Sequence, residues 1–84
     1  MITRKDMSLD DIPEGWIYSI ESTLGKTEAV AKIYDLLGQD CIIGVDNEKK
    51  NLFLAVSKKS EAKFDELTDA VTNMMTISFG IKNR

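Results

Sequence analysis

The stretch FDELTDAVTNMMTISFGIK, residues 64–82, changes its hydrophobic spacing part-way along. Up to residue 75 the apolar residues recur every three or four positions, which is the spacing of one helix face. From Ile77 onward they alternate with Ser78, Gly80 and Lys82, which is the spacing of a strand with one buried face. The stretch therefore predicts a helix at about 61–75 followed by a strand at 76–82.

The residues before this stretch predict three more strands and one more helix. Aromatic and β-branched residues favour strands at 16–21, 41–46 and 52–56. Apolar residues at helical spacing favour a helix from a Thr27 N-cap to about Leu37, which Gly38 ends. The element order is then β-α-β-β-α-β. With right-handed crossovers, this order predicts a ferredoxin-like two-layer α+β sandwich: a four-stranded antiparallel sheet of order 4-1-3-2 with both helices on one face.

The first fourteen residues do not belong to this pattern. Ser8 and Asp11 have the spacing of a capping box and predict a short helical turn, which Pro13 stops. Residues 1–14 are therefore interpreted as an N-terminal arm with a short helical turn, and residues 15–84 as a single α+β domain. A chain of 84 residues has room for one core and buries only about 60–65% of its unfolded surface.

Composition argues against several classes of function. The net charge of −3 disfavours a protein that coats nucleic acid, and no apolar run reaches the ~20 residues that span a bilayer. The chain has no histidine, the commonest general base and metal ligand, so nothing of that kind activates Cys41. We therefore expect no enzyme activity, no cofactor, no metal site and no membrane contact, and we place the protein in the cytoplasm.

Each predicted strand has one more apolar side, which we assign to the helices. On the first strand this side carries Trp16, Tyr18 and Ile20. The opposite, open side of the sheet then carries Ile17, Ile42 and Phe53 among small residues such as Ala55. A contiguous apolar patch often marks an interaction site, so we expect a partner or a second copy to dock there. The alternatives are scattered apolar residues or burial under the 1–14 arm.

Acidic residues form a stripe on the second predicted helix. Glu61, Asp65 and Asp69 are spaced at i, i+4 and i+8, which aligns them on one flank. Like charges at this spacing cost roughly 0.2–0.5 kcal/mol per pair. The stripe therefore indicates a basic partner, such as a nucleic-acid-binding protein, with a solvated helix face as the alternative.

Two short patterns suggest small ligands or nucleic acid. Gly25-Lys26-Thr27 is similar to the end of a phosphate-binding P-loop, but Ile20 stands where that motif needs a glycine, so only an anion at the helix start stays open. Tyr18 and Phe53 lie on the strands that carry base-stacking aromatics in the RNA-recognition motif. Residues 50–56 lack that motif's glycines and paired aromatics, so single-stranded nucleic-acid binding is a disfavoured alternative.

A further resemblance concerns the first predicted helix and the loop before it. With the element order, Gly25 and the segment Ile33-Tyr-Asp-Leu-Leu37 resemble the ACT domain, a small regulatory module that binds amino acids and often pairs side by side. The likeness covers most of residues 16–82. It implies a ligand-sensing regulatory domain as an alternative function.

The residues themselves favour a non-enzymatic protein-binding module, a small acidic regulator or inhibitor that acts by occupying a surface. Free-standing acidic domains of this size are common among phage and mobile-element proteins, so that origin is a general expectation. The residues assigned to the interface are Ile17, Ile42, Phe53 and Ala55 on the sheet face, and Glu61, Asp65 and Asp69 on the acidic helix.

Overall fold

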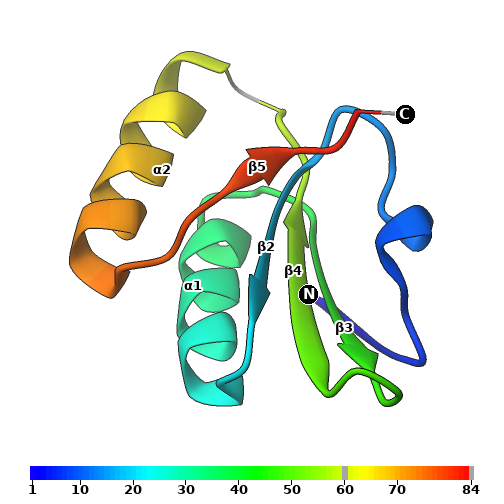
Figure 1. The fold of residues 1–84 in the computed structure, drawn as a ribbon. Coiled ribbons are helices and arrows are strands. Elements are labelled where there is room, and N and C mark those ends of the chain that lie inside the picture. The colour runs from blue at the N-terminus through cyan, green and yellow to red at the C-terminus, as the bar shows by residue number, and fades with distance from the viewer. Residues whose placement is uncertain (60, 84) are drawn as a thin grey trace.

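The computed structural model describes residues 1–59 and 61–83. Within them the chain forms five strands, two α-helices and one short 3₁₀ helix (Figure 1). Their order and bounds are β1 (Ile2–Lys5), η1 (Leu9–Asp11), β2 (Ile17–Glu21), α1 (Leu24–Leu36), β3 (Cys41–Asp46), β4 (Asn51–Val56), α2 (Glu61–Met75) and β5 (Gly80–Ile81).

The strands form one mixed sheet in the order β1-β3-β4-β2-β5. β1 runs parallel to β3, whereas the β3–β4, β4–β2 and β2–β5 pairs are antiparallel. The broad α+β class is confirmed. The predicted four-stranded antiparallel ferredoxin-like sheet is wrong, because residues 2–5 of the arm add a parallel edge strand. This strand was missed because all four of its residues are exposed, so burial imposes no alternation on its sequence.

Both helices lie on one side of the sheet, and the N-terminal residues that follow β1 lie on the other (Figure 1). Each side buries its own apolar cluster. We call these the helix-side core and the arm-side core. The helix-side core consists of Ile17, Val30, Ala31, Tyr34, Cys41, Ile43, Leu54, Val56, Phe64, Val71 and Ile77. The arm-side core consists of Met7, Ile12, Ile42, Phe53 and Ala55, with Trp16 and Tyr18 packed against it.

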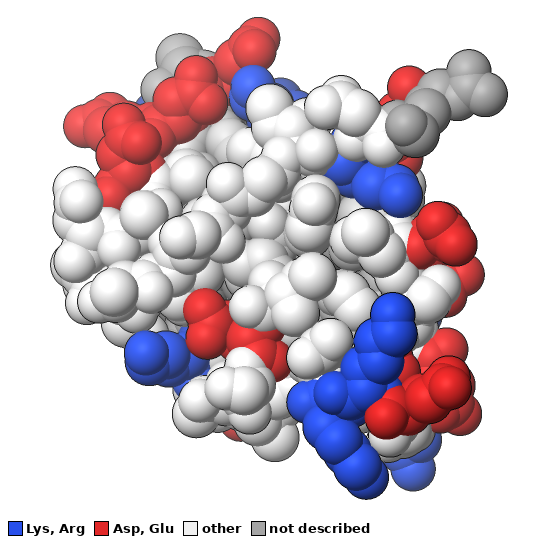
Figure 2. Space-filling model, viewed as in Figure 1, with Lys and Arg blue, Asp and Glu red and all other residues white. Residues whose placement is uncertain are grey.

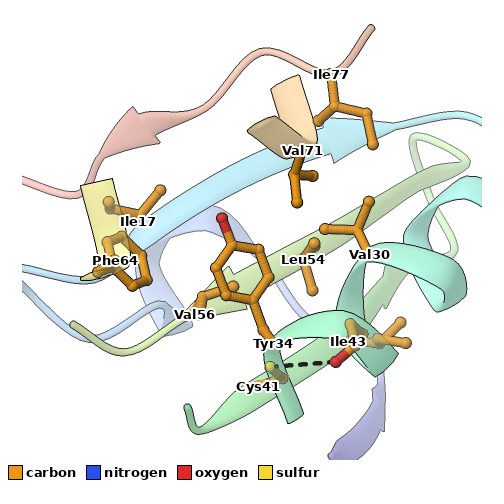
Figure 3. Packing of buried hydrophobic residues seen from close by; sticks show 11 residues of the cluster. Ile17, Val30, Tyr34, Cys41, Ile43, Leu54, Val56, Phe64, Val71 and Ile77 are labelled. Atoms are coloured by element: carbon orange, nitrogen blue, oxygen red, sulfur yellow. Dashed lines mark hydrogen bonds between the residues drawn. The ribbon is translucent and has the colours of Figure 1, made fainter. Parts of the chain in front are cut away.

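Tyr34 joins the two helices inside the helix-side core (Figure 3). Its ring lies 5.5 Å from that of Phe64 and 6.2 Å from that of Phe79, measured between centroids. Its hydroxyl shares a 2.7 Å hydrogen bond with Thr68 Oγ1 of α2. This bond gives the buried phenol a polar partner, so α2 is held to α1 by a specific contact as well as by apolar packing.

Strand β2 presents the opposite faces from those predicted. Ile17 is paired with Val56 and belongs to the helix-side core, whereas Trp16 and Tyr18 pack on the arm side. Because both faces of the sheet are covered, the more apolar side of a strand no longer identifies the helical side. The faces predicted for β3 and β4 are confirmed, since Ile43 and Leu54 lie on the helix side and Ile42 on the arm side.

Two element boundaries also differ from the prediction. Helix α1 begins at Leu24 with Thr23 in the N-cap position, so Thr27 lies inside the helix. The predicted strand 76–82 is reduced to Gly80–Ile81. The stop at Gly38 is confirmed, because its φ of +80° is the left-handed geometry that favours glycine after a helix. The predicted cap of the second helix, Ser60, lies outside the described residues.

Candidate protein-interaction site

The sheet face that was predicted to be open is covered. Ile42, Phe53 and Ala55 are 6%, 3% and 0% exposed, and Met7 and Ile12 of the arm pack on them. The prediction of an uncovered docking face is therefore wrong, and its stated alternative, burial under the 1–14 arm, is confirmed. The three residues reach a partner only if the arm leaves the sheet.

A glycine allows the arm to approach the sheet closely. A Cβ atom added at Gly44 would lie 2.7 Å from both Cβ and Cγ of Met7, and closer still to its sulfur. The Met7 N–H donates a 2.8 Å hydrogen bond to the Val45 carbonyl oxygen, next to Gly44 in β3. Because residue 44 has no side chain, Met7 can occupy the space above it.

The short turn of the arm contains the predicted contact between Ser8 and Asp11. The Asp11 carboxylate accepts a 2.9 Å hydrogen bond from the Ser8 N–H, as expected for the acid of a capping box. The turn itself is a single 3₁₀ turn, Leu9–Asp11, and the chain after it is extended at Ile12. This turn places Met7 and Ile12 at its two ends, where both are buried against the sheet.

Ile17, the fourth sheet residue assigned to the interface, is placed on the wrong face by the sequence. It is 6% exposed and lies beneath the helices. Its alternation with Tyr18 was interpreted from apolar content alone, and the aromatic side of β2 in fact faces the arm. Ile17 therefore contributes to folding rather than to an accessible surface.

The three acidic residues predicted on α2 are accessible. The side chains of Glu61 and Asp65 are 78% and 66% exposed, and Asp69 is exposed as well. Lys58 Nζ lies 3.2 Å from Glu61 Oε1 and 3.8 Å from Asp65 Oδ1, so one lysine serves two carboxylates. Figure 2 shows acidic side chains gathered over the N-terminal half of α2. Among the described residues Asp69 has no ion-pair partner.

A groove that the sequence did not reveal lies beside α2. It has a volume of about 440 Å³ and runs between this helix and the segment after α1. Its lining is largely apolar, with one lysine and one glutamate. The lining residues are Leu37, Gln39, Lys63, Phe64, Glu66, Leu67 and Ala70. The spacing of Lys63, Leu67 and Ala70 could have indicated a second exposed flank of α2, opposite the acidic stripe.

Cys41 is a buried core residue. Burial, with a smaller contribution from the nearby Asp35 carboxylate, raises the pKa of its thiol to about 11. Its sulfur makes weak 3.6 Å hydrogen bonds to the carbonyl oxygens of Ala31 and Gln39, the first of which is drawn in Figure 3. The reactive thiolate is therefore suppressed at neutral pH, which does not suit a nucleophile.

The Gly25-Lys26-Thr27 segment forms the first turn of α1. Thr27 is fully buried, and its Oγ1 donates a 3.3 Å hydrogen bond to the Thr23 carbonyl oxygen, so this hydroxyl is not directed at a ligand. Gly25 and Lys26 are exposed.

No cluster of three or more possible metal-ligating side chains occurs in residues 1–59 and 61–83. Neither helix of this described part combines the length and the hydrophobicity needed to cross a membrane.

Comparison with known protein families, curated proteins and solved structures finds no significant similarity. The candidate site therefore rests on the geometry of this chain. The accessible features are the acidic stripe of α2 and the apolar groove on the other flank of the same helix.

Proposed function

We propose that this chain is a non-enzymatic protein-binding module, a small regulator or inhibitor that occupies a basic surface on another protein. The acidic stripe, Glu61, Asp65 and Asp69, makes the contact. The observation that carries the proposal is that three exposed carboxylates share one flank of α2, and that among the described residues Lys58 pairs with two of them while Asp69 has no ion-pair partner. A basic partner relieves the repulsion among them and is steered to the stripe by its field.

The structure changes which residues this proposal uses. Ile17, Ile42, Phe53 and Ala55 are buried within the chain, so they are not part of the proposed contact. Nucleic-acid binding by base stacking on Phe53 would require the arm to leave the sheet first. We place the interaction in the cytoplasm, where a reduced, unpaired cysteine is usual.

The proposal is tested by selecting a displayed library of random peptides on the immobilised protein at physiological salt. We expect enrichment of peptides rich in lysine and arginine, with affinity that falls as salt rises. The double substitution Asp65→Lys with Asp69→Lys should weaken binding of the enriched peptides by more than about tenfold, since it reverses two charges of the stripe.

A matched control makes the same change of net charge elsewhere. Asp10→Lys with Glu48→Lys replaces two exposed acids outside α2. If this control variant reduces the affinity for the enriched peptides as much as the α2 variant does, binding depends only on the net charge of the protein. The acidic stripe is then not a site. Enrichment of apolar or acidic peptides would also contradict the proposal.

A further inference from the structure

The groove beside α2 is flanked by projecting apolar side chains. Leu36 and Leu37, at the end of α1, are 86% and 57% exposed, and Leu37 forms part of the groove wall. On α2, Met74 is 72% exposed and continues the flank of Leu67 and Ala70 at helical spacing. Leu36, next to Leu37 in the chain, and Met74, one turn beyond Ala70 on α2, thus add exposed apolar side chains near the two elements that form the groove.

Two charges of opposite sign line the groove. Lys63 and Glu66 both line it, both are exposed, and within residues 1–59 and 61–83 neither forms an ion pair. A uniformly basic partner would be repelled by Lys63, and a uniformly acidic partner by Glu66. The matching surface must carry one charge of each sign next to apolar groups, as this surface itself does.

We propose that two copies of this chain pair through this groove about a two-fold axis. In a two-fold contact, each residue that meets a second residue on the partner is met by it in return. Lys63 of each copy then faces the partner's Glu66, and the exposed Leu36 of each copy enters the hollow of the other. By helical periodicity the acidic stripe lies on the opposite flank of α2, so pairing does not bring the two stripes together.

Sedimentation equilibrium of the full chain from about 1 μM to about 1 mM tests this inference. We expect a reversible dimer. Lys63→Glu and Glu66→Lys, taken singly, should each weaken the dimer by about tenfold or more, because each sets like charges against each other twice. An equimolar mixture of these two variants should associate at least as well as the original chain, because both contacts again join opposite charges.

A second pair of variants tests the apolar contact. Leu36→Glu should abolish the dimer, whereas Leu24→Glu, at the other end of α1 and 50% exposed, should leave it unchanged. All substituted side chains are exposed, so circular dichroism should show that each variant is folded.

The inference fails if the original chain is monomeric at about 1 mM, if the single charge variants dimerise as it does, or if their mixture stays monomeric. It does not depend on the proposed function, since Asp65→Lys with Asp69→Lys should still dimerise. If the dimer forms but no basic peptides are selected, only the proposed function is overturned. If basic peptides are selected but no dimer forms, only the pairing is overturned.

Discussion

The two faces of the sheet are both buried, but by very different means. The helix-side core takes eleven buried residues from two helices and three strands, and from Ile77. The arm-side core takes five, two of which, Met7 and Ile12, come from the segment between β1 and β2, whose regular structure is one 3₁₀ turn. The first face is covered by elements with their own internal hydrogen bonds. The second is covered by the arm, which is held in position by its contacts with the sheet.

This difference shows how stability should divide within so small a domain. A segment with few internal hydrogen bonds and few buried side chains can open locally while the rest of the protein stays folded. We therefore expect the arm to open at a lower free energy than the global unfolding of the domain. The predictions below test that division.

The largest expected effect comes from the helix-side core. Phe64→Ala removes a side chain that is 1% exposed and that packs on the Tyr34 ring, so it should lower the free energy of unfolding by about 3–5 kcal/mol. For a domain of this size that is a large part of its stability. Urea denaturation followed by circular dichroism measures the loss.

The companion variant acts on the other face. Met7→Ala removes a side chain that is 2% exposed, but it should mainly free the arm. Hydrogen exchange should then accelerate in residues 1–14 and remain slow in α1, with a clearly smaller shift of the urea midpoint than Phe64→Ala gives. An equal shift would show that both faces belong to one cooperative core.

The sequence predicts the helices and strands more reliably than it predicts which segments pack on each face of the sheet. The long periodic segments gave β3 and α2 with their observed bounds, because 41–46 and 61–75 have strong strand and helix patterns. The short turn within residues 1–14 was found from Ser8 and Asp11. Docking of the arm on the sheet was given only as an alternative, since a strand pattern shows that a face is buried without showing what buries it. Strand β2 was therefore assigned backwards, because its more apolar side, which carries Trp16 and Tyr18, faces the arm and not the helices.

The candidate site divides in the same way. The exposure of Glu61, Asp65 and Asp69 could be predicted, because charged residues at helical spacing stay in water. The groove could not, because it depends on the distance between Leu37 and α2, which are joined by more than twenty residues of chain and meet only in the folded structure.

The second prediction disturbs only the arm side of the sheet, by enlarging one side chain on that face. Gly44→Val places a branched side chain where Met7 packs, and it should push the arm off the sheet at a cost of about 1–3 kcal/mol. The Met7 amide, which donates to the Val45 carbonyl, should lose its protection from hydrogen exchange. The helix-side core should keep its protection.

The control for this variant is a glycine with free space around it. A Cβ atom at Gly25 meets nothing within 4 Å, and the residue lies in the first turn of α1. Gly25→Ala should therefore leave the arm in place and raise stability slightly, because alanine favours a helix over glycine by up to about 1 kcal/mol. Unchanged exchange at Met7 in the Gly44 variant would show that the arm does not rest on that surface.

The smallest expected effect concerns a buried polar atom that faces the helix-side core and forms no hydrogen bond with the described residues. Ser19 is 2% exposed and pairs with Leu54, and its Oγ has no hydrogen-bond partner among the described residues. A buried hydroxyl without a partner costs about 1–3 kcal/mol. Ser19→Ala should therefore raise the free energy of unfolding by about 1 kcal/mol, once the weaker strand preference of alanine is included.

Ser57 provides the matched comparison. It is also buried, but its Oγ accepts a 3.0 Å hydrogen bond from the Asp40 N–H. Ser57→Ala should lower the free energy of unfolding by about 1 kcal/mol, because it leaves that N–H without its partner. The two serine variants should thus move the urea midpoint in opposite directions. If both lower it, the Ser19 hydroxyl has a partner in solution, and the helix-side core is wetter than its apolar lining implies.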